Sequence, residues 1–233
     1  MKYLKNALKK LFRSSLSILY LILTSIICKV RSIYYSQKID EGGGKIIITV
    51  PFISFKINKH YSSNLYIKGN FRVVPFMGGD DPILISLGEN SKMQINGDFI
   101  IGQGVRIHLS KNSTLTIGGK DKESDSGITC DTLIMVYKRI EIGTDFLCAW
   151  DIFITDSDWH KIVGQNHHAD VIIGDHVWIA NNNNILKGSN IGNNCIVASN
   201  SKIINSTFSD DILIGGIPPK ILKTDVKWSR DIE

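Results

Sequence analysis

The stretch VIIGDHVWIANNNNILKGSNIGNNCIVASNSKII, residues 171–204, decides the fold. Within it an aliphatic residue recurs every six positions, at Ile173, Ile179, Ile185, Ile191, Val197 and Ile203. A period of six fits neither an α-helix nor an alternating strand, but it suits a coil in which each short strand points one aliphatic side chain inward before the chain turns. Three such strands make one coil of about 18 residues, so the stretch predicts a parallel β-helix.

The same spacing continues toward the N-terminus in shifted phases. One block runs through Cys130, Val136, Ile142, Cys148 and Ile154, and a weaker one through Ile95, Ile101 and Ile107. The phase changes mark insertions, of which residues 156–170 are one. Asparagine tolerates left-handed backbone angles, so tight corners are predicted at Asn181 to Asn184, Asn193, Asn194 and Asn200.

The N-terminal segment differs from the rest of the chain. Residues 1–40 hold eight Lys and Arg against one acid, and LSILYLILTSIIC at 16–28 is almost wholly apolar. A run of about 13 residues is short for a membrane span, so we predict an α-helix associated with a membrane surface through residues 1–31. A helix packed on the body, a signal peptide and a span are the alternatives.

Glycines 42–44 mark the boundary after that helix. We therefore expect a helical segment at 1–41, an all-β body at 42–223 and a tail at 224–233. The body from residue 41 onward has 19 basic against 21 acidic residues, which argues against nucleic-acid binding. The four cysteines lie far apart without a CxxC pair, as is typical of free thiols in a reducing cytoplasm.

Residues 130–223 resemble the left-handed parallel β-helix acyltransferases of the hexapeptide-repeat superfamily. The segments IGDHVWIA at 173–180, ITDSDWH at 154–160 and GGIPPKILK at 215–223 carry the resemblance, which is strongest to bacterial surface-polysaccharide and sugar O-acetyltransferases. The resemblance implies a left-handed winding, a homotrimer with sites between subunits, and acetyl transfer from acetyl-CoA to a sugar hydroxyl of a polysaccharide or its precursor. No metal is expected.

A sugar hydroxyl needs a base to remove its proton as it attacks the thioester, and histidine serves near neutral pH. Of the six histidines, His160 is the candidate, because it lies in the interruption of the repeat and resembles the catalytic histidine of the family. Asp156 and Asp158 precede it, and either carboxylate would orient the imidazole. Strand alternation predicts that the three side chains face one way.

The remaining predicted site residues bind the two substrates. Asp131 matches a position that grips acceptor hydroxyls in the related galactoside enzymes, while Trp150 and Trp159, at one coil level, would stack on sugar rings. The cofactor residues that the resemblance implies are Trp178 as a wall of the cleft, Asn181 and Ser199 beside the pantetheine, and Lys220 and Lys223 at the phosphates. Turn formation and core packing are the competing interpretations for these positions.

Three other functions remain open from the sequence. N-acetylation of a nucleotide-linked amino sugar uses the same donor and a similar fold. A β-helix hydratase would need three histidines converging on zinc, but the HxxxxH spacing of that family is missing. A non-catalytic scaffold would present a β-helix surface and use the apolar helix as its anchor.

Overall fold

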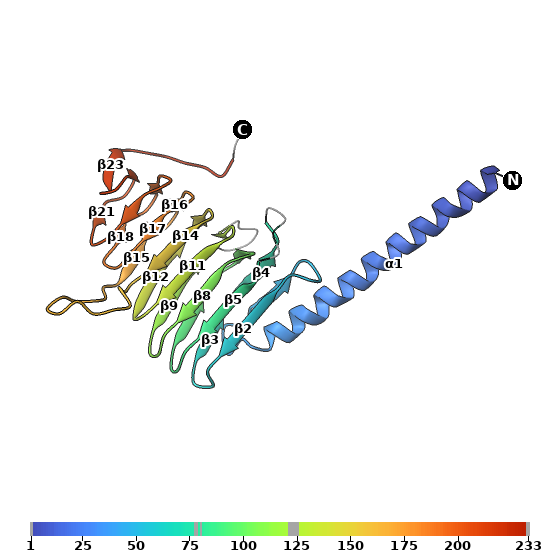
Figure 1. Ribbon diagram of the computed structural model, residues 1–233, viewed down its shortest axis with the longest axis horizontal. Helices are drawn as coiled ribbons and strands as arrows, with labels where there is room; N and C mark the ends of the chain where they lie inside the picture. Colours follow the sequence, from blue (N-terminus) through green and yellow to red (C-terminus); the bar gives the residue numbers. More distant parts are fainter. Residues whose placement is uncertain (1, 77–78, 80, 121–125, 232–233) are drawn as a thin grey trace.

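The computed structural model describes residues 2–76, 79, 81–120 and 126–231, with side chains from residue 17 onward. From Lys45 to Phe208 the chain forms a parallel β-helix. Seven coils each add one short strand to each of three parallel sheets, so the solenoid is a triangular prism (Figure 1). The parallel β-helix predicted from the six-residue repeat is confirmed.

Each sheet collects every third strand. The first sheet contains β1 (Lys45–Ile48), β4 (Asn70–Val74), β7 (Phe99–Gly102), β10 (Gly127–Ile128), β13 (Leu147–Cys148), β16 (Trp178–Ile179), β19 (Ile196–Val197), β22 (Leu213–Gly215) and the antiparallel β23 (Lys220–Lys223). The second contains β2 (Phe55–Lys59), β5 (Ile83–Leu87), β8 (Arg106–Leu109), β11 (Thr132–Val136), β14 (Ile152–Thr155), β17 (Asn184–Ile185) and β20 (Lys202–Ile203). The third contains β3 (Asn64–Ile67), β6 (Lys92–Ile95), β9 (Thr114–Gly119), β12 (Arg139–Thr144), β15 (Val171–Ile173), β18 (Asn190–Ile191) and β21 (Thr207–Phe208).

The residues of the six-residue repeat fill the interior of the prism. Each aliphatic position predicted between 173 and 203 is buried, as are those of the two earlier blocks. The N-terminal coils also bury large aromatic side chains, with the rings of Phe71 and Phe99 stacked 6.3 Å apart. Burying one such Ile or Leu side chain contributes about 1.5–3 kcal/mol, so the column of aliphatics is the main source of stability.

Three corners join the sheets. The first corner leads from the first sheet to the second, the second corner from the second sheet to the third, and the third corner from the third sheet back to the first. Left-handed backbone angles occur at Asn182, Asn194 and Asn200, as predicted. They do not occur at the other predicted positions, which are Asn181, Asn183, Asn184 and Asn193. Asn183 is buried instead: its side-chain nitrogen donates to the Ala180 carbonyl of its own coil, and its side-chain oxygen accepts from the Ser201 amide of the next coil.

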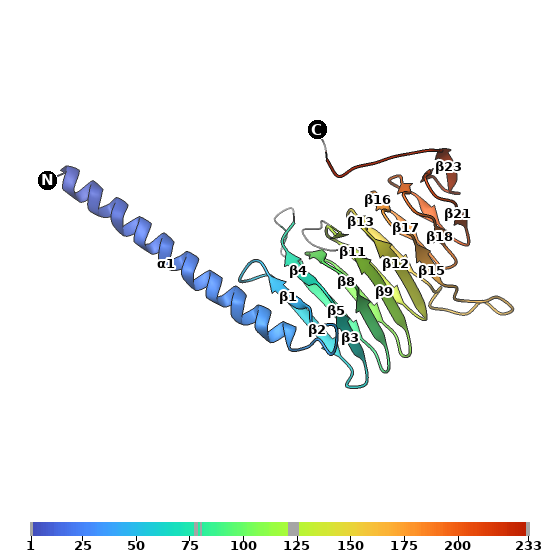
Figure 2. The same ribbon diagram turned by 180° about the vertical axis from the view of Figure 1, so that it is seen from behind.

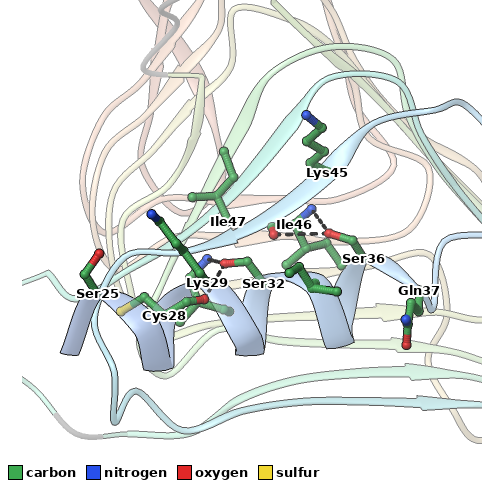
Figure 3. Close-up of a pocket in the computed structure, with 11 residues that line it drawn as sticks. Ser25, Cys28, Lys29, Ser32, Ser36, Gln37, Lys45, Ile46 and Ile47 are labelled. Carbon is green, nitrogen blue, oxygen red and sulfur yellow. Dashed lines mark hydrogen bonds between the residues drawn. The ribbon is translucent and has the colours of Figure 1, made fainter. Parts of the chain in front are cut away.

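Helix α1 (Lys2–Ser36) projects away from the N-terminal end of the prism (Figures 1 and 2). Its last turns contact the coils. The hydroxyls of Ser32 and Ser36 accept hydrogen bonds of 2.9 Å from the amides of Ile48 and Ile46 in β1 (Figure 3). The Arg31 guanidinium also donates to the Pro51 carbonyl. The end of the helix therefore provides hydrogen-bond partners for backbone amides of the edge strand β1, which would otherwise be free to pair with another chain.

Candidate active site

Residues 156–170 leave the solenoid at the second corner, between the end of β14 and the start of β15, and form a protruding loop (Figure 1). Its base is closed by backbone hydrogen bonds. The amide of Asp158 donates to the His167 carbonyl at 2.8 Å, and that of Ala169 to the Asp156 carbonyl at 3.0 Å. These two bonds hold the ends of the loop together and thereby fix the residues that follow Asp158 and precede His167.

Asp156 is buried and holds the turn that precedes β12. Its carboxylate accepts hydrogen bonds of 2.7 Å from the backbone amides of Tyr137, Lys138 and Arg139. Three amide donors occupy most of the acceptor capacity of the group. These contacts favour a structural role for Asp156.

Asp158 forms an ion pair with Lys187, whose side chain is only 11% exposed. The Lys187 ammonium also donates to the carbonyl of Asn166 at 2.8 Å. One buried lysine therefore ties both arms of the loop to the next coil.

Trp159 has a left-handed backbone conformation with φ +62°, which is costly for a bulky aromatic residue. Its indole N–H donates to the Thr155 hydroxyl at 2.9 Å, and its amide donates to the Ser157 hydroxyl at 3.1 Å. Strain of this kind persists where the surrounding structure enforces it, and it is frequent at functional sites. Here it reverses the chain direction immediately before His160.

His160 is exposed and makes no hydrogen bond, ion pair or ring contact with the described part of the chain. The prediction that Asp156, Asp158 and His160 face one way was wrong. Strand β14 ends at Thr155, so the alternation of a strand no longer applies beyond it. Asp156 points inward while His160 lies on the surface of the loop.

A second group of predicted residues lies at the first corner. Asp131 lines a pocket of about 450 Å³ with Arg106 and Asp151, and its own φ of +46° also gives it a turn role. Asn181 accepts a 2.7 Å hydrogen bond from the Ser199 hydroxyl of the next coil. Asp131, Asn181 and Ser199 therefore share one edge of the prism.

Trp150 also lies at this first corner. It belongs to the same coil as Trp159, as predicted, but strand β14 separates the two residues. Within one chain the two tryptophans do not form a common sugar-binding surface.

Trp178 lies half-buried on the outer face of the first sheet. The ring of Trp228, in the C-terminal tail, lies 6.0 Å from it. Lys220 and Lys223 lie exposed on β23, at the C-terminal end of the prism. The tail thus returns from that end to the face that carries Trp178.

Asp145, at the third corner, anchors the tail. Its carboxylate lies 2.8 Å from His176 Nδ1, 2.9 Å from an Arg230 nitrogen and 3.2 Å from Lys120 Nζ. The His176 and Trp228 rings stack with centroids 4.0 Å apart. Burial raises the pKa of the Asp145 carboxyl, but the hydrogen bonds from these three cationic or imidazole groups lower it more, so the net pKa is below its ordinary value.

Other chemistry within the described residues is limited. Burial raises the pKa of the Cys130 and Cys148 thiols to about 12, so neither is a thiolate near neutral pH. All four cysteines are free. Among the residues with described side chains, no three His, Cys, Asp or Glu are grouped to hold a metal ion.

A cavity of about 700 Å³ lies between α1 and β1 (Figure 3). Its walls include Cys28, Ile33 and Ile47, and it holds none of the predicted site residues. Because it is apolar and far along the chain from the repeat interruption, we do not assign the reaction to it.

Sequence reasoning missed several residues of these clusters. Tyr137 contacts three side chains of the loop, Lys187 tethers that loop, and His176 with Trp228 adjoins Trp178. Among the described non-glycine residues with positive φ, only Trp159 and His176 are neither Asn nor Asp. No sequence signal identifies that strain, because it depends on contacts between coils.

The stacked hexapeptide coils and the loop that interrupts them match the acyltransferases of the hexapeptide-repeat type. The chain is 32% identical over 175 residues to the polysialic acid O-acetyltransferase of Neisseria meningitidis, a match that covers 72% of this chain and 76% of the relative. It therefore belongs to the O-acetyltransferases of polysaccharide biosynthesis.

Further similarities were found among known proteins. The chain is 31% identical over 157 residues to WbbJ of Escherichia coli K12, named as a lipopolysaccharide biosynthesis O-acetyl transferase, covering 60% of this chain and 71% of the relative. The crystal structure of the polysialic acid O-acetyltransferase OatWY aligns with 83% of this chain and 92% of its own, at 26% identity and a TM-score of 0.46. No family profile matches the chain.

Proposed function

We propose that this enzyme transfers acetyl from acetyl-CoA to a sugar hydroxyl of a bacterial surface polysaccharide or its precursor, with His160 as general base. The observation that carries the proposal is the His160 imidazole, which is exposed and has no hydrogen-bond partner in the described residues, on a loop whose base is fixed by backbone hydrogen bonds. The chain that carries this loop belongs to the polysaccharide O-acetyltransferases. The relatives act on polysialic acid or in lipopolysaccharide biosynthesis, as their names state, and both acceptors present hydroxyl groups.

In the proposed reaction, neutral His160 accepts the proton of the acceptor hydroxyl while the oxygen attacks the thioester carbonyl. The tetrahedral intermediate collapses by breaking the carbon–sulfur bond, and the leaving sulfur takes up the proton. Histidine returns to its neutral form, and the products are the acetyl ester and coenzyme A. We infer that Asp156 and Asp158 support this step by fixing the loop that carries His160.

The site is proposed to form between two protomers of a homotrimer. In a triangular prism, the second corner lies opposite the first sheet, so His160 and Trp178 are on opposite sides of one chain. The outer face of the first sheet carries the half-buried apolar side chains of Ile100, Leu147 and Ile196 beside Trp178. An apolar stripe of this kind suits a subunit contact.

The donor is proposed to lie along the first corner, with its pantetheine beside Asn181 and Ser199 and with Trp178 as a wall of the cleft. Lys220 and Lys223 would bind its phosphates, because both residues are exposed at the C-terminal end of the prism. Point charges of this kind bind phosphate with little demand on geometry.

Mixing two inactive variants tests the shared site. His160→Ala and Trp178→Ala each remove one half, so each homotrimer should be nearly inactive. Co-expression at equal levels should restore about one quarter of the wild-type sites, because a site is intact only when its His160 comes from a Trp178→Ala protomer and its Trp178 from a His160→Ala protomer. Mixed trimers without activity would show that the two residues do not form one site across an interface, and a monomeric active protein in light scattering would contradict the trimer.

The exposed part of α1 is proposed to bind the cytoplasmic face of the membrane. The large apolar side chains from Ile18 to Ile26 are each about 50–65% exposed. The helical segment at residues 17–36 is also long and apolar enough to cross a bilayer. The basic residues before this segment complement anionic lipids. The last turns of α1 are engaged by β1, so the part available to lipid precedes Arg31.

Flotation of the full-length protein with phosphatidylglycerol vesicles tests this proposal. Leu21→Asp with Ile22→Asp should lower vesicle-bound protein at least about 10-fold, because each carboxylate costs several kcal/mol in an apolar bilayer segment. Val163→Asp, at a 95% exposed apolar residue of the loop, is the matched control and should float like the wild type. Equal flotation of all three proteins would contradict the membrane role.

A further inference from the structure

A cluster of aromatic and imidazole rings lies on the solenoid next to His160. The ring of Tyr137 contacts those of Trp159, His167 and His168, with centroids 6.2, 4.8 and 5.3 Å away. His108, on the outer face of β8, lies 6.3 Å from Trp159. We call His108, Tyr137, Trp159, His167 and His168 the ring platform.

The platform is built from three successive coils. His108 is on β8, Tyr137 follows β11, and Trp159 follows β14, and these strands are neighbours in the second sheet. Neighbouring strands lie about 4.8 Å apart, so the platform extends about 10 Å along the prism from the level of His160. It extends toward the coils from which α1 projects (Figure 1).

Several features show that the platform is more than surface packing. Trp159 is held in a strained left-handed conformation by bonds to Thr155 and Ser157. Tyr137 remains 38% exposed, and His108 is exposed. The His168 Nδ1 atom is buried without a hydrogen-bond partner in the described residues, which is uncommon for a polar atom and calls for a functional reason.

We propose that the ring platform binds the glycan chain of the acceptor beyond the sugar that is acetylated. This inference rests on the proposed role of His160. A pyranose ring has an apolar face of C–H groups that stacks on aromatic rings, and its hydroxyls pair with imidazole and phenol groups. A platform about 10 Å long, the span of three neighbouring strands, is longer than one pyranose ring and can contact more than one sugar unit. The enzyme therefore prefers oligosaccharides to single sugars.

Acceptor length is the variable that tests the platform. The host surface polysaccharide, freed of O-acetyl groups and partly hydrolysed, supplies a length series. With the wild type, KM for the glycan should fall as the length grows from one to about three sugars. Tyr137→Ala and His108→Ala should each raise KM for the longer glycans about 10-fold and leave KM for acetyl-CoA unchanged.

Two controls separate stacking from folding. Tyr137→Phe keeps the ring and should retain the length dependence, whereas Tyr61→Ala, at a 94% exposed tyrosine of the same corner in the first coil, should change nothing. His108→Ala removes an exposed ring whose one described ring contact is Trp159, so its fold is not at risk. The same length dependence in wild type and both alanine variants would overturn the proposal.

Direct binding distinguishes this inference from the proposed reaction. Calorimetry with the His160→Ala protein measures the affinity for a purified oligosaccharide without turnover. Tyr137→Ala in that background should weaken binding about 10-fold. Unchanged affinity would overturn the platform even if His160 proves to be the base, and weakened affinity would support it even if His160→Ala remains active.

Discussion

Replacing His160 with alanine is expected to reduce acetyl transfer by roughly 100-fold or more, because the acceptor hydroxyl loses the base that removes its proton. The side chain is exposed and makes no hydrogen bond, ion pair or ring contact with the described part of the chain, so its removal should leave the fold intact. The affinity for coenzyme A should also remain nearly unchanged. Steady-state kinetics, thermal unfolding and calorimetry with coenzyme A measure the three quantities.

His167→Ala is the matched control for this variant. His167 lies in the same loop and is more buried, but its Nδ1 lies 3.3 Å from the Ser157 hydroxyl and its ring contacts Tyr137. We expect its loss to affect mainly the KM for the glycan. Near-normal kcat in His160→Ala, or an equal loss of kcat in His167→Ala, would remove the assignment of His160 as the base.

Replacing Asp156 with alanine is expected to lower the free energy of unfolding by about 3–5 kcal/mol, because the three amides at 137–139 lose a buried charged acceptor. For a chain of this size, the melting temperature should fall by on the order of 10 °C. Asp170→Ala is the control. Its carboxylate pairs with Arg139 at the surface, so we expect a change of less than about 1 kcal/mol.

The two proposed roles of Asp156 differ in what they predict. A structural carboxylate changes the melting temperature, whereas a residue that orients His160 changes kcat at an unchanged melting temperature. Both quantities are measured on the same preparation, with kcat taken well below the transition. A lower kcat without any loss of stability would show that Asp156 acts on His160.

The position of His160 could be predicted from the sequence more readily than its surroundings. The interruption of a strict repeat identifies the loop, and ITDSDWH places the histidine in it. The direction of each side chain could not be predicted, since Asp156 turns inward to amides from the previous coil and Lys187 reaches the loop from the next one. Such contacts join residues about 20 to 30 positions apart, and no local pattern encodes them.

The sequence by itself determined the solenoid, because one aliphatic side chain in every six can be buried only if the chain turns between short strands and stacks coil on coil. It also determined the apolar helix and the residue types available for catalysis. Only the tertiary structure decided which of these residues meet. Folding into a prism places His160 and Trp178 on opposite sides, brings His108, Tyr137 and Trp159 together from three coils, and returns Trp228 to the face of Trp178. The reason is geometric: the corner at which a side chain lies depends on the phase of the repeat and the lengths of the insertions summed over many coils.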